Sequence, residues 1–129
     1  MKRLEQVLNE ANKCLNCKNA ICVQKGCPVN TDIPNFISKI KEKNFEYAYH
    51  ILQENNIMSD ICSKICPVEK QCMGSCIKGI KGSPIKINEL ESFVNEWAKD
   101  NNVEHEIKCN ESNNIKVAII GRWTSRNVV

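Results

Sequence analysis

The sequence predicts an all-α domain over residues 1–100, built around two cysteine-rich segments. Apolar residues recur every three to four positions, the period of an α-helix, in four separate stretches. These stretches are residues 3–13, 33–43, 45–54 and 87–99. Eight of the nine cysteines form two groups of four between these stretches, at 14–27 and 62–76. Only 5% of the residues are aromatic, so the core is thin and bound metal is expected to help hold the fold.

The first two predicted helices carry the chain into and out of the first cysteine group. The first helix has a continuous apolar face and leads directly to Cys14. The second follows a good N-terminal cap, Thr31 or Asp32, and has Pro34 in its first turn. Its predicted inward residues are Phe36, Ile37 and Ile40.

The third and fourth predicted helices supply the rest of the core. The third begins after Asn44 and forms an αα-hairpin with the second, and a turn at 79–84 precedes the fourth. Their predicted inward residues are Phe45, Ala48, Tyr49, Leu52, Leu90, Phe93, Val94, Trp97 and Ala98. Glu91 lies about 100° around the helix from Leu90, so its carboxylate can point inward from the edge of the buried stripe.

The second cysteine group reads C-x3-C-P-x4-C-x3-C. We expect a short helix to end at Cys66, because Pro67 follows it, and another helix to begin at about Val68. In such a helix Cys72 and Cys76 are four positions apart and share a face.

The C-terminal part of the sequence differs from the rest. Residues 101–114 are polar and predict a linker. Residues 115–121 form an apolar run ending in Gly121, which is typical of the first strand of a dinucleotide-binding domain. The second and third glycines of G-x-G-x-x-G are missing, so we predict a truncated strand without a nucleotide site. Residues 122–129 form an unmatched tail.

Composition and charge exclude several classes of partner. The net charge is +3, and basic and acidic residues are mixed, which argues against a nucleic-acid partner. The N-terminus lacks the apolar region of a signal peptide, and no stretch approaches about 18 apolar residues, so no membrane partner is expected. We therefore expect a cytoplasmic protein, whose reduced thiols bind metal or clusters rather than form disulfides.

The first cysteine group reads C-x2-C-x4-C-x4-C-P and is similar to the run that binds clusters in bacterial ferredoxins. Zinc sites favour paired C-x2-C knuckles, and Cys14 with Cys17 is the only such pair, so iron–sulfur clusters are favoured over zinc. We expect Cys22 to share their cluster, whereas Cys27, held by Pro28, is directed elsewhere. The spacing leaves two arrangements open: one site per group, or a crossed arrangement in which the second group completes both clusters.

Several motifs occur in the order in which they occur in one known family. They are Cys27-Pro-Val-Asn, Ile33-Pro-x-Phe-Ile37, Asn56-Ile-Met-x-x-Ile-Cys62-x-x-Ile-Cys66-Pro, Gln71-Cys-x-x-x-Cys76 and Pro84-Ile-x-Ile-x-x-Leu90-Glu91-x-Phe93. On these motifs, residues 1–100 resemble the N-terminal iron–sulfur domain of the NAD(P)H-dependent glutamate synthase small subunit, which also occurs in dihydropyrimidine dehydrogenase. The resemblance implies an α-helical ferredoxin-like fold with two [4Fe–4S] clusters. Family members usually continue into FAD and NAD(P)H domains, whereas the match here ends at Gly121.

The resemblance also implies which residues bind the clusters. The first cluster takes Cys14, Cys17, Cys22 and Cys76. The second takes Cys27, Cys66, Cys72 and Glu91. Glu91 stands where dihydropyrimidine dehydrogenase has a side-chain amide as fourth ligand, and Cys62 is then a nearby non-ligand. Counting thiols alone favours Cys62 as the fourth ligand, so both assignments stay open.

These features predict an electron-transfer module between a flavin- and NAD(P)H-dependent oxidoreductase and an electron-accepting partner subunit. The resemblance places FAD and NAD(P)H in a full-length parent. We expect no catalysis by this chain alone, because neither His50 nor His105 belongs to a catalytic constellation of nucleophile and carboxylate residues. Two alternatives stay open. One is a zinc- or cluster-stapled docking module without a redox role, and the other is a redox sensor that uses Cys109, the ninth cysteine.

Overall fold

The computed structural model describes residues 2–106 and 114–118. The described residues form helices and no strand, which confirms the all-α prediction. The α-helices are α1 (Lys2–Asn12), α2 (Ile33–Lys41), α3 (Phe45–Asn55), α4 (Ser59–Ile65), α5 (Lys78–Lys81) and α6 (Ile87–Asp100). A π-helical turn, η1 (Cys22–Gly26), and a 3₁₀ turn, η2 (Val68–Lys70), lie in the cysteine segments.

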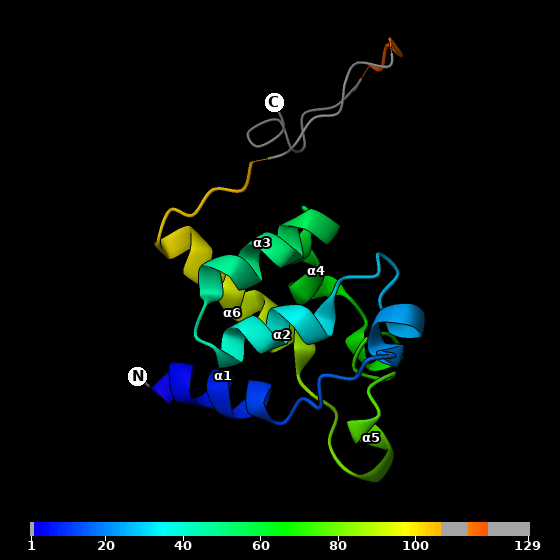
Figure 1. Ribbon diagram of the computed structural model, residues 1–129. Coiled ribbons are helices and arrows are strands. Elements are labelled where there is room, and N and C mark those ends of the chain that lie inside the picture. The colour runs from blue at the N-terminus through cyan, green and yellow to red at the C-terminus, as the bar shows by residue number, and fades with distance from the viewer. Residues whose placement is uncertain (1, 107–113, 119–129) are drawn as a thin grey trace.

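Helix α6 lies at the centre of the bundle. It packs against α4, α3 and α1, while α2 packs against α3 and α1 (Figure 1). The two cysteine segments and α5 lie together at one end of the bundle, on the right of Figure 1. None of the helices within residues 2–106 combines the length and the hydrophobicity that crossing a bilayer requires.

The core forms where α2, α3 and α6 meet. Its buried large side chains include Phe36, Ile37, Ile40, Leu52, Leu90 and Val94, which match the predicted inward faces. The aromatic residues Phe93 and Trp97 are only partly buried, and their rings lie 5.4 and 5.5 Å from the ring of Phe45. These aromatic rings therefore close the edge of the core rather than fill its centre.

Side-chain caps determine where α2 and α3 begin. The Asp32 carboxylate accepts a hydrogen bond from the Asn35 backbone N–H at 3.4 Å, and the Asn44 side chain accepts one from the Tyr47 N–H at 3.2 Å. Of the two predicted caps for α2, Asp32 is therefore the one in use. Pro34 lies in the first turn, as predicted, where its missing N–H costs no intrahelical bond.

The predicted helix from about Val68, with Cys72 and Cys76 on one face, is wrong. Only a single 3₁₀ turn forms, and the Gly74 backbone N–H donates back to the Val68 carbonyl oxygen at 3.1 Å. The chain turns so tightly that a Cβ at Gly74 would lie 2.0 Å from the Glu69 carbonyl oxygen. A tight glycine turn therefore takes the place of the predicted helix between the two cysteines.

Two short helical turns form where the sequence pattern predicts none. The turn η1 begins at Cys22, and the Cys27 backbone N–H donates to the Cys22 carbonyl oxygen at 2.9 Å. Helix α5 occupies part of the turn predicted at 79–84 and ends before Gly82. These turns have 5 and 4 residues, which is too short for a repeat of apolar residues to reveal them.

The segments after α6 are described in part. Residues 101–106 and 114–118 have no regular secondary structure. The rest of the predicted strand at 115–121, the tail at 122–129 and Cys109 lie outside the described residues. The linker and the strand therefore stay predictions.

Replacing Phe36 with Ala is expected to lower the free energy of unfolding by about 3–5 kcal/mol, because the side chain is 0% exposed and its loss leaves a cavity. Anaerobic urea unfolding of the cofactor-loaded protein, followed by circular dichroism, measures the loss. Tyr47→Ala is the control, because this aromatic side chain on α3 is 52% exposed and should cost about 1 kcal/mol or less. Equal losses for the two variants would contradict the core described above.

Candidate functional site

Four of the predicted ligands line one cavity at the cysteine end of the bundle. The cavity is partly open to solvent. The thiols in its wall are Cys14, Cys17, Cys22 and Cys76. The wall also includes the buried side chains of Ile33, Ile37 and Ile85. Three thiols of the first segment thus meet one thiol of the second segment in an apolar setting.

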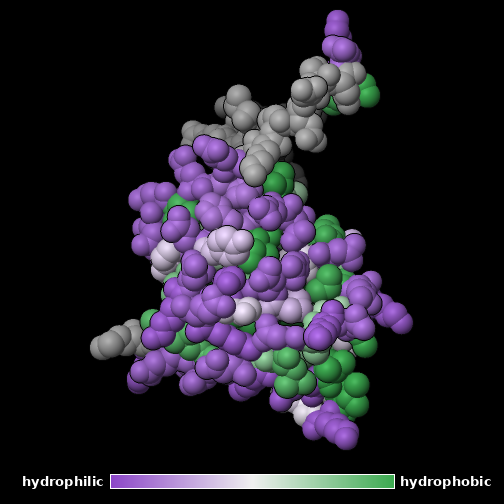
Figure 2. Space-filling view, in the orientation of Figure 1, coloured by the Kyte–Doolittle hydropathy of each residue, from purple (hydrophilic) through white to green (hydrophobic). Residues whose placement is uncertain are grey.

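Exposed apolar side chains surround the mouth of this cavity. Leu15, Ile21 and Ile77 line it and are 60%, 41% and 38% exposed. In Figure 2 hydrophobic side chains gather at the lower right, over the end of the bundle that carries α5. The exposed part of the cavity wall is therefore largely apolar as well.

Two of these thiols, Cys14 and Cys22, are harder to ionise than a free cysteine, chiefly because they are partly buried. Burial raises the pKa of Cys22 to about 11, and the charges of the other three thiols add to the rise. Burial also raises the pKa of Cys14, against the opposing effects of the Asn16 backbone N–H and the Lys41 charge. Several thiolates in one apolar cavity need a cationic group to compensate their charge. The donor set therefore fits a metal-containing cofactor.

Lys41 and Asn16 hold the first thiol loop against α2. The Lys41 ammonium donates to the Cys14 carbonyl oxygen at 2.8 Å and to the Asn16 side-chain oxygen. The Asn16 amide donates in turn to the Pro34 carbonyl oxygen at 2.7 Å. The backbone of Asn16 is left-handed, with φ 49°, a conformation that Asn tolerates better than most residues. The position of Asn16 inside the C-x2-C pair could have suggested its role from the sequence, whereas no sequence pattern singled out Lys41.

The remaining predicted ligands form a second group. Burial raises the pKa of Cys72 to about 12, and the charges of Glu91 and Cys27 add to the rise. Burial also raises the pKa of Cys66, helped first by Cys62 and then by the same two groups. These side chains are close enough for the charge of one to affect the pKa of another. Like the first group, this group contains residues of both cysteine segments.

Close packing joins the two segments at Gly26. A Cβ added there would lie 2.8 Å from the Cys72 Cα and 3.0 Å from the Gln71 carbonyl oxygen. The next residue, Cys27, has its sulfur 3.5 Å from the backbone nitrogen of the buried Thr31. The absence of a side chain at Gly26 thus lets Cys27 approach the second segment.

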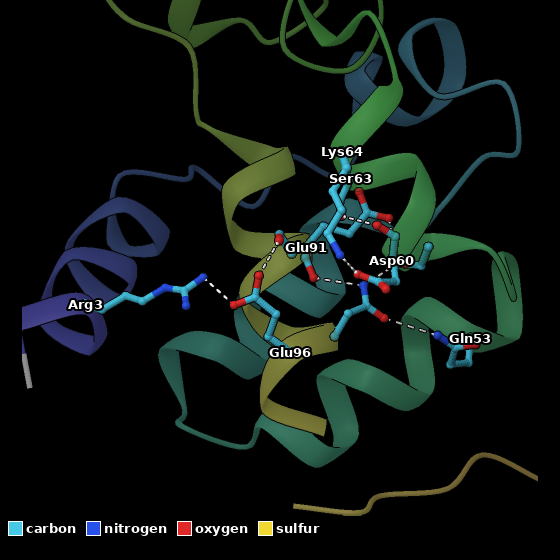
Figure 3. A network of polar contacts seen from close by, with 10 residues as sticks. Arg3, Gln53, Asp60, Ser63, Lys64, Glu91 and Glu96 are labelled. Carbon is cyan, nitrogen blue, oxygen red and sulfur yellow. Dashed lines mark hydrogen bonds and ion pairs between the residues drawn. The ribbon is translucent and has the colours of Figure 1, made fainter. Parts of the chain in front are cut away.

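Glu91 points from α6 toward α4. Its Oε1 accepts a hydrogen bond from the Ser59 hydroxyl at 2.7 Å (Figure 3). Burial raises the pKa of Glu91 to about 7, and the Ser59 bond opposes that rise. Cys62 lies beside Cys66 and contributes to its raised pKa. Both candidates for the fourth ligand of the second cluster are therefore near the same thiol.

A chain of polar side chains behind Glu91 joins three helices. The Asn95 amide nitrogen donates to the Ser59 hydroxyl oxygen and to the Glu91 carbonyl oxygen, each at 2.9 Å. Gln53 of α3 donates to the Asn95 side-chain oxygen at 3.3 Å (Figure 3). Ser59 and Asn95 are 0% and 6% exposed. Sequence reasoning missed both residues, although an Asn one turn from Glu91 beside a buried stripe was a usable signal.

The arrangement of the thiols suits a cluster better than a single ion. Within residues 2–106 and 114–118, no three His, Cys, Asp or Glu side chains meet closely enough to hold one metal ion. In a four-iron cluster each thiolate binds a separate iron atom, so the ligands stand around a wider body. Four thiols that line one cavity, without converging on a single point, match that requirement.

The two histidines meet away from the thiols. The Nδ1 atoms of His50 and His105 are 3.1 Å apart, and the ring centroids are 5.3 Å apart. His105 follows α6, so this contact ties the segment after α6 to α3. The sequence placed the two residues 55 positions apart and did not suggest their contact. That neither has a catalytic role stays a prediction.

Comparison with known proteins identifies the family. The family model described as dihydropyrimidine dehydrogenase domain II, 4Fe-4S cluster, matches residues 1–103. The NAD-dependent dihydropyrimidine dehydrogenase subunit PreT of Escherichia coli (strain K12) is 36% identical over 97 residues, which are 75% of this chain and 23% of that protein. The glutamate synthase [NADPH] small chain of the same strain is 29% identical over 116 residues, 90% of this chain and 24% of that protein. The chain thus spans about a quarter of these curated relatives. It belongs to the family of 4Fe-4S iron–sulfur domains represented by domain II of dihydropyrimidine dehydrogenase, as the resemblance predicted.

Proposed function

We propose that the chain is an electron-transfer module that carries two [4Fe–4S] clusters. It relays single electrons between a flavin- and NAD(P)H-dependent oxidoreductase and a partner subunit, in an assembly of the glutamate synthase or dihydropyrimidine dehydrogenase kind. The observation that carries the proposal is the cavity lined by four thiols, in a chain whose family is a 4Fe-4S domain.

The proposed ligand sets are crossed between the two cysteine segments. The first cluster is bound by Cys14, Cys17, Cys22 and Cys76. The second is bound by Cys27, Cys66, Cys72 and Glu91, with Cys62 as the alternative fourth ligand. The division is supported by the electrostatic effects, because the charges within each set act on one another. A cluster completed by both segments also ties distant parts of a thin core together.

The residues around each cluster set its charge and its access to water. When bound, a [4Fe–4S] cluster accepts and releases one electron at a time. The buried side chains of Ile33, Ile37 and Ile85 offer no polar group on their side of the cavity, so they solvate the added negative charge of the reduced state poorly. An N–H directed at a sulfur, such as that of Thr31 at Cys27, favours the reduced state instead. The balance of these effects sets the reduction potential.

The proposed partners are a flavoprotein domain or subunit and an electron-accepting subunit similar to the glutamate synthase large subunit. The names of the relatives, a dehydrogenase subunit and a small chain, support a partner subunit. We assign FAD and NAD(P)H to a longer parent, because this chain spans about a quarter of those relatives. In this proposal the chain itself carries electrons without a catalytic residue and works in the cytoplasm.

Metal analysis with a redox titration tests the proposal. Anaerobically reconstituted protein is expected to hold about eight iron and about eight sulfide per chain and to show two reversible one-electron reductions by EPR. A chain that binds clusters but cannot be reduced reversibly would be a cluster-stapled docking module instead. Colourless protein with stoichiometric zinc and no sulfide would contradict the proposal in favour of a zinc-stapled module.

A further inference from the structure

We propose that Ser59 is a positioning residue that holds the Glu91 carboxylate with one oxygen occupied and the other available to iron. This inference rests on the proposed second cluster and adds residues to it that are not ligands. Its basis is a relay of hydrogen bonds from Gln53 through Asn95 and Ser59 to Glu91. Figure 3 labels the two ends of this relay, Gln53 and Glu91.

The direction of each hydrogen bond in the relay follows from its neighbours. The Asn95 amide nitrogen donates to the Glu91 carbonyl oxygen at 2.9 Å, and its side-chain oxygen accepts from Gln53 at 3.3 Å, which fixes the orientation of the amide. The same nitrogen donates to the Ser59 oxygen at 2.9 Å. Since a hydroxyl has one proton, Ser59 directs that proton to Glu91 Oε1, at 2.7 Å. Glu91 is thus the final acceptor, which favours the ionised carboxylate that a metal ligand requires.

Burial makes the relay rigid. Ser59 is 0% exposed at the first residue of α4, and Asn95 is 6% exposed in the middle of α6. Gln53 lies on a third helix, α3, so residues of three packed helices hold the Glu91 carboxylate in position. A free glutamate side chain samples many rotamers, and the relay removes that freedom before any iron is bound. The charge of Glu91 acts on Cys66 and Cys72, so the carboxylate lies within reach of the proposed second cluster.

The effect on the cluster has a definite direction. A hydrogen bond to a ligand oxygen withdraws electron density from the iron and stabilises the reduced state. Removing the Ser59 hydroxyl makes the carboxylate a stronger donor, so the potential of the second cluster should fall. The first cluster has four cysteine ligands in the proposed assignment and should keep its potential.

The experiment uses the full chain, reconstituted anaerobically, with Ser59→Ala and a matched control. Ser63→Ala is the control, because Ser63 is also a buried serine of α4, 5% exposed, whose hydroxyl donates to the Asp60 carbonyl oxygen and not to Glu91. Gln53→Ala is a second variant at a partly exposed helix position and will fold even if Ser59→Ala loads poorly. EPR-monitored potentiometry measures the midpoint potential of each cluster separately.

The expected result is a lower potential and an altered EPR signal for one cluster in Ser59→Ala, a smaller shift in the same direction in Gln53→Ala, and wild-type values in Ser63→Ala. Unchanged potentials in both Ser59→Ala and Gln53→Ala would overturn the inference. So would loss of one cluster in Cys62→Ala with none lost in Glu91→Ala, since Cys62 would then be the ligand. These results would leave the proposed function intact, whereas a wild-type chain without reducible clusters would overturn both.

Discussion

Replacing Cys76 with Ala is expected to abolish one [4Fe–4S] signal and to lower the iron content from about eight toward about four per chain. Cys76 comes from the second cysteine segment, but it lines the same cavity as three thiols of the first. Without it one iron of the proposed cluster loses its thiolate, and no other cysteine within residues 2–106 lines the cavity. Iron and sulfide analysis with EPR of the dithionite-reduced protein measures the loss.

Two further variants show whether the sites are crossed. Cys109→Ala is the matched control, because Cys109 lies outside both cysteine groups and its loss should leave both signals unchanged. Cys66→Ala should remove the EPR signal that Cys76→Ala retains. If Cys66→Ala and Cys76→Ala remove the same signal, each segment binds its own cluster and the crossed assignment is wrong.

Replacing Gly26 with Ala is expected to weaken both clusters at once and to destabilise the fold by about 1–3 kcal/mol. The new Cβ would stand 2.8 Å from the Cys72 Cα and 3.0 Å from the Gln71 carbonyl oxygen, and both of these atoms belong to the backbone. Neither can rotate away as the end of a side chain could, so the two cysteine segments must separate. Each proposed ligand set takes residues from both cysteine segments. Moving the segments apart therefore increases the distances between the ligands of both clusters. The thermal midpoint and the iron content of the anaerobic protein measure the effect.

Gly82→Ala separates this steric effect from the loss of glycine itself. A Cβ at Gly82 would meet only the Lys78 carbonyl oxygen at 3.7 Å, an ordinary contact, and the φ of −179° is extended backbone that any residue adopts. This variant should have the same iron content and the same thermal midpoint as the wild-type protein. Normal iron content in Gly26→Ala would mean that the segments tolerate separation and that their contact does not hold the sites together.

Local patterns in the sequence determined most of the helical fold. Helical periodicity identified α1, α2, α3 and α6, because each is long enough to repeat an apolar face. Local rules also narrowed the cap of α2 to Thr31 or Asp32 and indicated that Glu91 can point inward. The cysteine spacing and the ordered motifs indicated an iron–sulfur domain, and the family comparison agrees.

The tertiary structure alone decided how distant residues combine. The tight turn at Gly74 depends on its contact with Glu69, and periodicity gives no sign of it. The contact of Lys41 with the Cys14 loop spans 27 residues, and that of Asn95 with Ser59 spans 36, so no local rule could reveal either. The sequence by itself thus determined the four longest helices and the residue types proposed as ligands. The packing of α4 and α6, together with the close approach at Gly26, decided which of those groups meet, because such contacts depend on the path of the whole chain.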